Sequence, residues 1–462
     1  MKSFQYLRRL STPLVVSIPF LSLVCSLLFL QSGVAQAAIR SKVNTIRAPA
    51  VYVNDGETAA GKPAHFRFKC QAANALVRCY SPQQIRKAYN IQSVLSEGIT
   101  GQGNTLVIID AYQSPTIVHD LATFNAVFGL PNPTFNIIAP DGLTPFNPND
   151  PNQVGWAAEI TLDVEWSHAV APGATIDLVL ARSSNDPDIL SATKFAVENN
   201  LGSVISQSFG EGETCADPNL LVAEHQVFKE ATAKHMTLFA SSGDDGAAQP
   251  TCDGSSFFLS ASTPASDPFV TGVGGTHLAA DPQTGTYLGE TAWNDSYGAS
   301  GGGLSVIYPR PNFQQDLVQR KSRGVPDVAY NGDVNGGVLV VWSSSGSGSN
   351  LVFIFGGTSA GSPQWAGIIA LGNQLAGHRL GFLNKAIYRI GESGSYTRAF
   401  HDIVIGNNTV VETDSSGKPV TILGYATQRD WDPVTGWGSP NVARLLPLLI
   451  DNDSAADGAS IE

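Results

Sequence analysis

The sequence predicts an α/β protein with a doubly wound, mostly parallel sheet and helices on both faces. Short, nearly continuous apolar runs, such as TLVIID at 105–110, are typical of strands that are covered on both faces. Segments of helical length separate these runs, and such alternation implies right-handed crossovers between parallel strands. The chain shows no internal repeat and no long linker, so we expect one large domain over residues 81–450.

The predicted elements follow one another in a regular order. Strands are expected at 105–110, 175–181, 203–209 and 236–242, with helices between them at about 116–128, 157–169, 186–199 and 217–234. Later strands are expected at 269–273, 337–342 and 351–355, before a helix from about 360 to 376. In a sheet of this kind, functional groups gather where strands end and helices begin.

The two ends of the chain depart from this pattern. Residues 1–38 have the form of an export signal, with a basic start, an apolar run and a small-residue cleavage site at 35–37. An uncleaved membrane anchor is the alternative. Residues 39–80 are polar, and we expect them to be irregular. Residues 451–462 form an acidic tail that we expect to be disordered.

Composition narrows the class of protein. Removal of the signal takes three of the 27 Lys and Arg, leaving 24 against 39 Asp and Glu, a formal charge of −15. So acidic a chain argues against nucleic-acid binding, and we expect a secreted monomer without stable membrane association. Four cysteines remain outside the signal and suggest two disulfides. Among the three possible connectivities, we favour the local pairs Cys70–Cys79 and Cys215–Cys252.

Ser359 is a candidate nucleophile. It stands in FGGTSAGSPQWAGIIAL (355–371), between a glycine-rich turn and a predicted helix. A serine in front of a helix is most often only a cap. Here, Gly356 and Gly357 permit unusual dihedral angles and the close approach of a substrate backbone. The helix start also directs amide dipoles toward developing negative charge, so the segment favours a nucleophile.

A carboxyl pair is the candidate base. His168 and His277 are more typical of structural or surface residues than of a catalytic histidine. Glu159 and Asp163 are four residues apart, so they project from one face of a helix. A solvated acidic face is the alternative. Apolar flanks favour instead a partly buried pair that shares a proton, in which one carboxyl acts as general base and the other holds it.

A third carboxyl group follows the strand predicted at 236–242. Asp244 lies in the glycine-flanked turn SSGDDGA (241–247), where its side chain could point into a cleft at the strand ends. Asp245 is the alternative at this place. The turn by itself does not decide between them, because Gly-Asp pairs are common in loops.

Together these segments resemble the sedolisins, or serine-carboxyl peptidases. The resemblance covers roughly residues 81–447 and implies a subtilisin-like fold and a peptidase that acts on proteins or peptides. The motifs that carry it occur in matching order and are SPQQIRKAYNI, GQGNTLVIIDAY, EITLDVEWSHAVAPGA, SVISQSFGEGE, SSGDDGA, GGTSAGSP and WDPVTGWGSPN. Agreement of this many elements is highly specific.

The resemblance implies a role for each candidate residue. Ser359 attacks the scissile carbonyl, Glu159 takes its proton, and Asp163 orients Glu159. Asp244 stabilises the oxyanion together with the backbone N–H of Ser359. SQSFG resembles the edge strand that pairs with the substrate backbone, which gives as substrate-binding residues Ser206, Ser208, Phe209 and Gly210.

The role of Asp244 predicts an acidic pH optimum. Its carboxyl must be protonated to donate a hydrogen bond to an oxyanion. The reference pKa of an aspartic acid is near 4, so activity at neutral pH would require a shift of roughly three units by burial.

The resemblance also implies one structural calcium ion, since oxygen ligands suit a hard cation. Asp402 and Asp432 would supply carboxylate oxygens, and Ile403 a backbone carbonyl. Gln428 and Asp430 stand where the family usually has glycines, so their carbonyls can bind only with some backbone strain. Two Asx-type turns without an ion are the alternative.

Several functions compete at this level. An acid endopeptidase is the first, and a tripeptidyl peptidase of the same family is a variant of it. A glycosidase that uses Glu159 and Asp163 leaves GGTSAGSP unexplained. An inactive, calcium-stabilised binding protein of the same fold is disfavoured because every catalytic position is filled. About 42 residues separate the signal from SPQQ, too few for the large prodomain that is common in the family.

Overall fold

The central sheet has eight strands, and the computed structural model describes it within residues 46, 51–318 and 320–453. In chain order the strands are β3 (Thr105–Ala111), β4 (Phe135–Ile138), β5 (Thr175–Ala181), β6 (Val204–Gln207), β8 (Thr237–Ser241), β12 (Thr271–Ala280), β13 (Tyr287–Ala292) and β16 (Val328–Asn331). The order across the sheet is β13-β12-β8-β6-β3-β5-β4, and β16 also pairs with β12. Only the β12–β13 pair is antiparallel, so the predicted mostly parallel sheet is confirmed.

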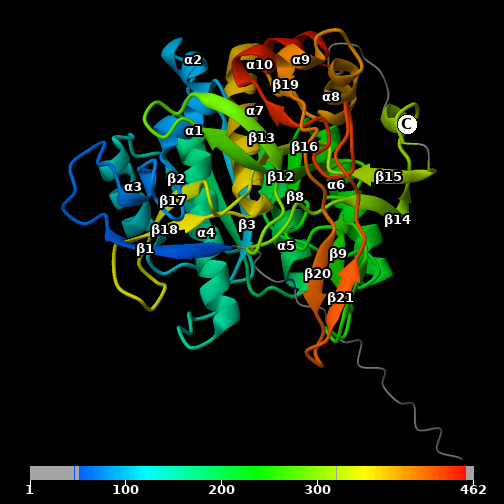
Figure 1. Ribbon diagram of the computed structural model, residues 1–462, viewed down its shortest axis with the longest axis horizontal. Coiled ribbons are helices and arrows are strands. Elements are labelled where there is room, and N and C mark those ends of the chain that lie inside the picture. Colours follow the sequence, from blue (N-terminus) through cyan, green and yellow to red (C-terminus); the bar gives the residue numbers. More distant parts are fainter. Residues whose placement is uncertain (1–45, 47–50, 319, 454–462) are drawn as a thin grey trace, which may run out of the picture. The chain divides into compact units, whose positions relative to one another are not determined.

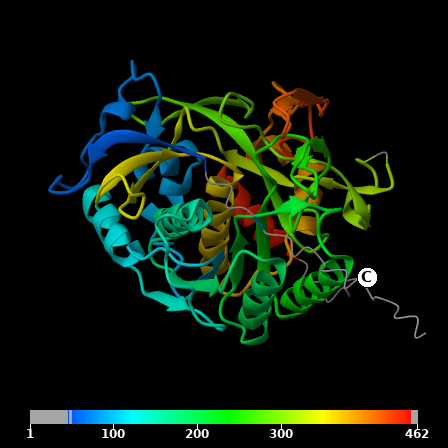
Figure 2. The same ribbon diagram turned by 90° about the horizontal axis from the view of Figure 1, so that it is seen from below.

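Helices cover both faces of this sheet (Figures 1 and 2). They are α3 (Ile117–Phe128), α4 (Pro151–Val170), α5 (Asp186–Glu198), α6 (Pro218–Ala233) and α7 (Gly361–Ala376). Successive side chains of a strand point to opposite faces. Val107 and Ile109 of β3 therefore pack with residues of α5 and α6, whereas Ile108 packs with residues of α3 and α4. The predicted doubly wound arrangement is confirmed.

Helix α4 begins earlier than predicted. The apolar pattern marks a start near residue 157, but the helix starts at Pro151, and the side chain of Asp150 accepts a hydrogen bond from the backbone N–H of Asn152 at 3.0 Å. Proline at the first helical position and an aspartate cap are both helix-start signals. The extra turns give α4 the length to carry Glu159 and Asp163 in its interior.

A second sheet lies beside the first and contains two strands that the sequence places in the central sheet. Its order is β1 (Tyr52–Thr58), β18 (Leu351–Phe355), β17 (Gly337–Trp342) and β2 (Cys79–Tyr80). The expectation that residues 39–80 are irregular is therefore wrong for β1 and β2. Apolar alternation indicates a strand but not its partner, because strand pairing here joins residues about 300 positions apart.

Two disulfides close local loops, as predicted. Cys70 is bonded to Cys79 and Cys215 to Cys252, with S–S distances of 2.02 and 2.09 Å. The predicted export signal (1–38) and most of the predicted tail (451–462) lie outside the described residues, and α10 (Val442–Asp451) is the last described helix. None of the helices in the described part of the chain has the length and apolar character that crossing a membrane requires.

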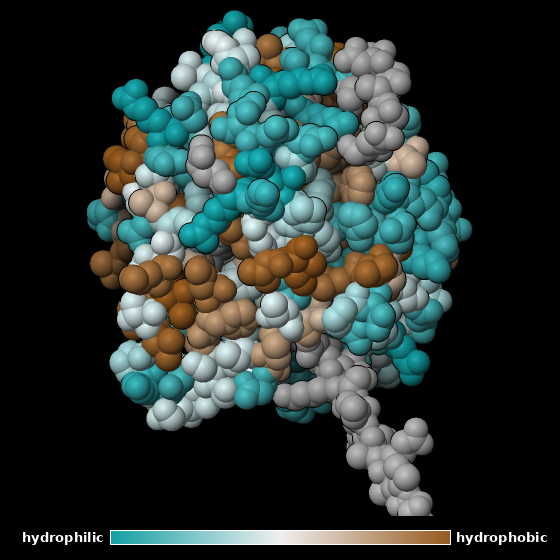
Figure 3. Space-filling model, turned by 90° about the vertical axis from the view of Figure 1, so that its right-hand side faces the viewer, coloured by the Kyte–Doolittle hydropathy of each residue, from teal (hydrophilic) through white to brown (hydrophobic). Residues whose placement is uncertain are grey.

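One face of the molecule is mostly hydrophilic, with a band of apolar side chains across it (Figure 3). The side shown there is the one on which Figure 1 places β14 (Gly303–Pro309) and β20 (Val410–Thr413). These two strands carry the exposed residues Val306 and Val411. A moderate amount of exposed apolar surface is normal for a folded domain.

Candidate active site

Ser359 lies where β18 ends and α7 begins, in the short helical turn Thr358–Ala360. Its side chain is fully buried. The preceding Gly357 has φ +88°, which favours glycine, and a Cβ atom there would lie 2.6 Å from Oδ2 of Asp244. The turn is therefore shaped by glycine so that Ser359 and Asp244 can approach each other.

Glu159 and Asp163 face the interior from α4. Both side chains have 0% exposure, so the alternative of a solvated acidic face is wrong. The Ser359 hydroxyl is among the groups that act on Glu159, and the Ser208 hydroxyl and Glu159 act on Asp163. Serine and both carboxyls are thus brought together, as the sequence predicts.

Burial is the main influence on these two carboxyls. It raises the pKa of Glu159 well above its ordinary value, and the neighbouring Asp163 and Asp110 raise it further, while the Ser359 hydroxyl lowers it. Burial likewise raises the pKa of Asp163, against the lowering effect of Ser208 and Glu159. A buried acidic cluster of this kind holds protons at pH values where an exposed carboxyl has lost them.

In the resting arrangement, the Ser359 hydroxyl does not make an ordinary hydrogen bond with Glu159. Its Oγ donates instead to the backbone carbonyl of Ser208 at 3.4 Å, and no carboxylate oxygen of Glu159 or Asp163 has a partner at standard hydrogen-bond geometry. The Ser359 hydroxyl nevertheless lowers the pKa of Glu159, so the two groups are close enough to interact.

Asp110 is a further member of this cluster that the sequence analysis missed. It stands near the end of β3, is fully buried, and neither of its carboxylate oxygens has a hydrogen-bond partner. Burial and the neighbouring Asp163 raise its pKa well above the ordinary value. The available signal was a carboxylate at the end of the buried run TLVIID, the edge at which functional groups gather.

Asp244, not Asp245, faces the serine turn. Its Oδ1 accepts hydrogen bonds from the backbone N–H of Thr358 at 2.7 Å and from the Thr358 hydroxyl at 2.8 Å. Its Oδ2 is buried without a partner and points toward Gly357. Burial raises the pKa of Asp244 to about 7, although both Thr358 donors lower it. Asp245 contributes only a small electrostatic increase.

The predicted substrate segment is not an edge strand at its start. Ser206 is paired on one side with Ile108 of β3 and on the other with Phe239 of β8, so its backbone is used within the sheet. Its hydroxyl lies in the core, 2.9 Å from that of Ser362. Because β6 ends at Gln207, only the residues after it leave the sheet.

The residues after β6 reach the serine turn. The Ser208 hydroxyl donates to the Ser359 carbonyl at 3.4 Å. Phe209 is fully buried against Trp156 of α4, with ring centroids 6.0 Å apart. A side chain at Gly210 would meet Ser262 and Thr263. Of the four predicted substrate-binding residues, only Gly210 is therefore not buried.

In the structure, His168 and His277 each have a partner other than Ser359. His168 is fully buried on α4, with Nε2 2.7 Å from the carbonyl of Pro131, and burial lowers its pKa to about 4. His277 pairs through Nδ1 with Asp333.

The predicted calcium ligands come from two segments, 402–403 and 428–432, which the structure brings into contact. Asp432 is buried, and its Oδ2 accepts from the backbone N–H of Gln428 at 3.1 Å. The backbone N–H of Asp430 lies 3.4 Å from Oδ2 of Asp402, whose Oδ1 is buried without a partner. Ile403, next to Asp402, is buried. In the described part of the chain, no three His, Cys, Asp or Glu side chains are grouped to hold a metal, so a cation here would depend on backbone carbonyls.

The predicted backbone strain in the segment 428–432 is present at one of two places. Asp430 has φ +64°, in the left-handed region that favours glycine. Gln428 is not among the described residues with positive φ, so the expectation of strain is wrong there.

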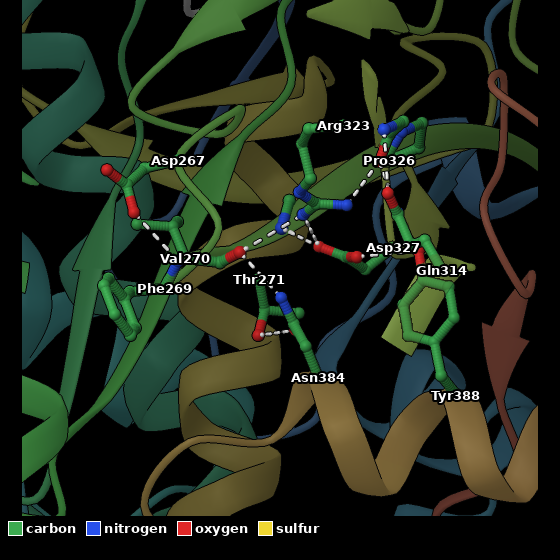
Figure 4. Close-up of polar contacts among 12 residues, drawn as sticks. Asp267, Phe269, Val270, Thr271, Gln314, Arg323, Pro326, Asp327, Asn384 and Tyr388 are labelled. Carbon is green, nitrogen blue, oxygen red and sulfur yellow. Dashed lines mark hydrogen bonds and ion pairs between the residues drawn. The ribbon is translucent and has the colours of Figure 1, made fainter. Parts of the chain in front are cut away.

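Arg323 and Asp327 form a buried ion pair just before β16 of the central sheet (Figure 4). The Arg323 guanidinium lies 2.5 Å from Oδ2 of Asp327, and both side chains have 0% exposure. The other oxygen, Oδ1, accepts from the Tyr388 hydroxyl of α8 (Asn384–Gly391) at 2.9 Å. The backbone carbonyl of Asp327 accepts from the N–H of Trp437, at 2.9 Å. The segment that follows Asp432 is thus hydrogen-bonded to a residue of the buried ion pair.

Comparisons with known proteins agree with this geometry. Residues 148–381 match the Subtilase family. Kumamolisin from Bacillus sp. (strain MN-32) is 32% identical, over 90% of this chain and 74% of its own length. Tripeptidyl-peptidase 1 from Bos taurus is 30% identical, over 63% of this chain and 52% of its own length.

A solved structure extends the likeness to three dimensions. Pseudomonas sedolisin, a serine-carboxyl proteinase complexed with two molecules of pseudo-iodotyrostatin, has a TM-score of 0.69 at 28% identity. That match covers 82% of this chain and 100% of the solved chain. The chain therefore belongs to the subtilase family of serine peptidases, and within it to the sedolisins, the serine-carboxyl peptidases.

Proposed function

We propose that this protein is a secreted endopeptidase that acts in acid through a Ser359–Glu159–Asp163 triad and an oxyanion site at Asp244. One observation carries the proposal. The buried carboxyls of Glu159 and Asp163 lie near the serine turn. The carboxyl of Asp244 also faces this turn, with its Oδ1 bound by Thr358 and its Oδ2 without a partner. A nucleophile, a base with its orienting group and a donor for developing charge are the parts that acyl transfer needs.

The reaction follows from these positions. The Ser359 hydroxyl rotates from the Ser208 carbonyl to the ionised Glu159 carboxylate, loses its proton to it and attacks the scissile carbonyl carbon. Protonated Asp244 donates through Oδ2 to the oxyanion. The tetrahedral intermediate then collapses, the C–N bond breaks, and Glu159 returns the proton to the leaving amine. Water then attacks the acyl-enzyme, and Glu159 takes the proton of the water and returns it to the Ser359 oxygen as the acyl group leaves.

The pH dependence has two sides. Burial raises the pKa of Asp244 to about 7, so its donating form is present below that pH and is lost as the pH rises through it. The raised pKa of Glu159 means that only part of the population carries the required carboxylate in acid, and that part grows with pH. We therefore propose a pH optimum on the acidic side of pH 7. Activity should persist to a higher pH than an aspartic acid with an ordinary pKa would allow.

The substrates are proteins or peptides, and we propose cleavage inside chains. Kumamolisin and tripeptidyl-peptidase 1 are both similar to this chain, and the match spans about half the length of the latter. Mass spectrometry of the products distinguishes internal fragments from successive tripeptides. We also propose export with cleavage after residue 38, which the N-terminal sequence of the protein in the culture medium tests.

We propose one structural calcium ion at Asp402, Ile403, Gln428, Asp430 and Asp432. The fit rests on the unpartnered, buried Oδ1 of Asp402 and on the oxygen-only donor set of the segments 402–403 and 428–432. Calcium would neutralise carboxylates that otherwise face each other. Chelation is expected to lower the melting temperature, and calcium but not magnesium to restore it, because the larger ion tolerates irregular ligation.

Two variants test the catalytic assignment. Casein hydrolysis at about pH 4 should be lost in Ser359→Ala, and retained hydrolysis would refute the assignment. Asp244→Asn should lose activity in acid but keep a remainder that no longer declines near pH 7, because an amide donates without titrating. Asp245→Asn is the matched control. If this variant loses activity and Asp244→Asn does not, the oxyanion donor is Asp245 and the assignment of Asp244 is wrong.

A further inference from the structure

A pocket of about 350 Å³ lies at the end of α7 that is remote from Ser359. Ser359 stands in the turn that precedes α7, whereas Asn373 and Gln374 of the last helical turn line the pocket. Thr105 and Ser203, near the starts of β3 and β6, line it from the central sheet. A helix of 16 residues is about 24 Å long, so the pocket is separate from the candidate active site.

The pocket differs in charge from the chain as a whole. The sequence contains 39 Asp and Glu against 27 Lys and Arg. Nevertheless, none of the described residues that line the pocket is acidic, and Arg379 and His378 are among them. Nε2 of His378 lies 2.8 Å from Oδ2 of Asp453, whereas Arg379 forms no ion pair with a carboxylate in the described part of the chain. Arg379 therefore gives this pocket a positive charge that no neighbouring carboxylate cancels.

Neutral acceptors hold the Arg379 side chain in place. Its Nη1 donates to Oδ1 of Asn200 at 2.6 Å and to the carbonyl of Lys234 at 3.3 Å. These bonds fix the guanidinium without cancelling its charge, and burial lowers the pKa of Arg379. An anion beside the guanidinium would offset this cost of burial. The planar N–H groups of an arginine match the oxygens of a carboxylate or a phosphate.

Asn373 supplies a second donor in the wall of the pocket. The residue is only 3% exposed, and its Nδ2 has no hydrogen-bond partner. The other atom of the amide is engaged, because Oδ1 accepts from the backbone N–H of Leu380 at 2.9 Å. A buried donor without an acceptor is unfavourable, and an oxygen of a bound anion would satisfy it. Arg379 and Asn373 thus favour the same kind of ligand.

The end of α7 carries a partial negative charge, which by itself would repel an anion. Two of the carbonyl groups at this end are already engaged. The carbonyl of Asn373 accepts from the N–H of Gly377 at 2.9 Å, and that of Ala376 lies 3.1 Å from Nδ1 of His378. Together with the charge of Arg379, these contacts reduce the repulsion.

The wall of the pocket is fixed before any ligand binds. Oε1 of Gln374 accepts from the backbone N–H groups of Thr100, Gly101 and Gln102, at 2.8, 2.7 and 2.9 Å. Its Nε2 donates to the carbonyl of Gly98 at 3.3 Å. A side chain of α7 thus holds the loop that leads into β3. A ligand that enters a preformed pocket does not have to order it first.

We propose that this pocket binds a small oxyanion, a carboxylate or a phosphate, between the Arg379 guanidinium and the Asn373 amide. The site goes beyond the peptidase function, since it needs neither Ser359 nor the carboxyl cluster. A ligand that binds the folded protein but not the unfolded chain raises the melting temperature. Binding is therefore measurable both as heat and as thermal stabilisation.

Titration calorimetry of the full chain carrying Ser359→Ala tests the proposal without self-cleavage. Inorganic phosphate and succinate are the probes, at about pH 6, where an ordinary carboxyl is ionised. Added Asn373→Asp keeps an oxygen for the Leu380 N–H but replaces the Nδ2 donor by a second oxygen. Added Arg379→Gln removes the positive charge. Each change should weaken the tighter probe at least about ten-fold, because a hydrogen bond to a charged group is worth that factor.

Arg182→Gln is the matched control. It removes an equal charge from an exposed residue outside the pocket and should leave the affinity for both probes unchanged. Tighter binding of phosphate than of succinate assigns phosphate chemistry to the site, and the reverse order assigns a carboxylate.

A role of Arg379 at the helix end alone predicts another result. Arg379→Gln would then lower the melting temperature of the anion-free protein and leave the affinity for both probes unchanged. That result, or failure of the parent protein to bind either probe, would overturn the proposal. At constant ionic strength, the tighter probe should raise the melting temperature of the parent and of Arg182→Gln more than that of the two pocket variants.

Discussion

Three carboxyl groups, of Asp110, Glu159 and Asp163, meet inside the protein, and burial and mutual repulsion are what raise the pKa of Glu159 most. Repulsion makes it costly for more than one of them to ionise at the same time. The cluster therefore behaves as one acid with several sites, from which a single proton leaves first. In the proposed reaction, Ser359 acquires its base when that first proton has left.

Asp110→Asn is expected to move the acidic limb of the pH–activity profile to lower pH. Asp110 raises the pKa of Glu159, so its neutralisation lets Glu159 ionise in stronger acid. The profile of kcat/KM between pH 2 and 6 measures the shift. Asp120→Asn is the control, because Asp120 is also buried with a raised pKa but binds Ser343, away from the cluster. An unchanged limb in Asp110→Asn would contradict the shared-proton account.

Gly357→Ala is expected to reduce kcat at least about ten-fold. A methyl group there meets Oδ2 of Asp244 at 2.6 Å and requires φ +88° of an alanine, a strain of about 1–3 kcal/mol. Gly394→Ala, where an added Cβ meets nothing within 4 Å, controls for the general cost of replacing glycine. Equal activity of the two variants would show that the close approach of Asp244 has no part in the reaction.

At the scale of elements, the segment 428–437 combines a favourable anchor with an unfavourable turn. The backbone N–H of Trp437 donates to Asp327 of the buried ion pair, whereas Asp430 has a positive φ, which favours glycine. Burial raises the pKa of Asp402 most. The Asp430 carboxylate raises it further, although the Tyr396 hydroxyl and the backbone N–H of Asp430 lower it.

Asp430→Gly is expected to stabilise the calcium-free protein by about 0.5–1 kcal/mol. The change relieves the positive φ and removes one of the opposing carboxylates. Urea denaturation in the presence of a chelator measures it. Gln428→Gly, at a residue without positive φ, should stabilise nothing and instead cost stability through the flexibility of glycine. A destabilised Asp430→Gly would mean that its side chain supports this segment.

The elements show what sequence patterns can and cannot predict. Apolar runs predicted β3, β5 and β8 well because buried parallel strands leave a continuous local pattern. The same pattern could not reveal that β17 and β18 pair with β1 and β2 rather than with the central sheet, since the partners are distant. Ser206 was misplaced for the same reason: strand neighbours decide whether its backbone is free.

The candidate site was predictable to a similar degree. Ser359, Glu159, Asp163 and Asp244 each lie in a recognisable motif, and the structure brings them together. Asp110 lies in no such motif, and only three-dimensional proximity to Asp163 reveals it. The raised pKa of Asp244 could not be inferred either, because its cause is burial.

At the scale of the whole molecule, acid should stabilise the protein. Burial raises the pKa of Glu165 well above its ordinary value, that of Glu224 to about 8 and that of Asp244 to about 7. Each of these carboxyls has a higher pKa in the folded protein than in the unfolded chain. Its contribution to stability is fully present below the pKa of the unfolded chain and is lost as the pH rises through the pKa of the folded protein. His225, whose pKa is raised by hydrogen bonding to Asp267, acts in the same direction.

The Ser359→Ala protein is therefore expected to melt roughly 5 °C or more higher at pH 4.5 than at pH 7.5 in the presence of chelator. Calorimetry at the two pH values measures this. Glu224→Gln should reduce the difference, because it removes one group that titrates within the window. A higher melting temperature at pH 7.5 would show that other charges outweigh the buried acids.

The strand β1 has a consequence for any shortened version of this protein. It lies along the outer edge of β18, the strand that leads into the serine turn, and Val51 accepts from the amide of Gly356. A version that begins at Ser81, where the resemblance to other peptidases starts, would lack β1. Strand β18 would then be an exposed edge strand that can pair with other molecules. Recombinant production should accordingly retain the residues from at least Val51 onward, or expect aggregates in place of enzyme.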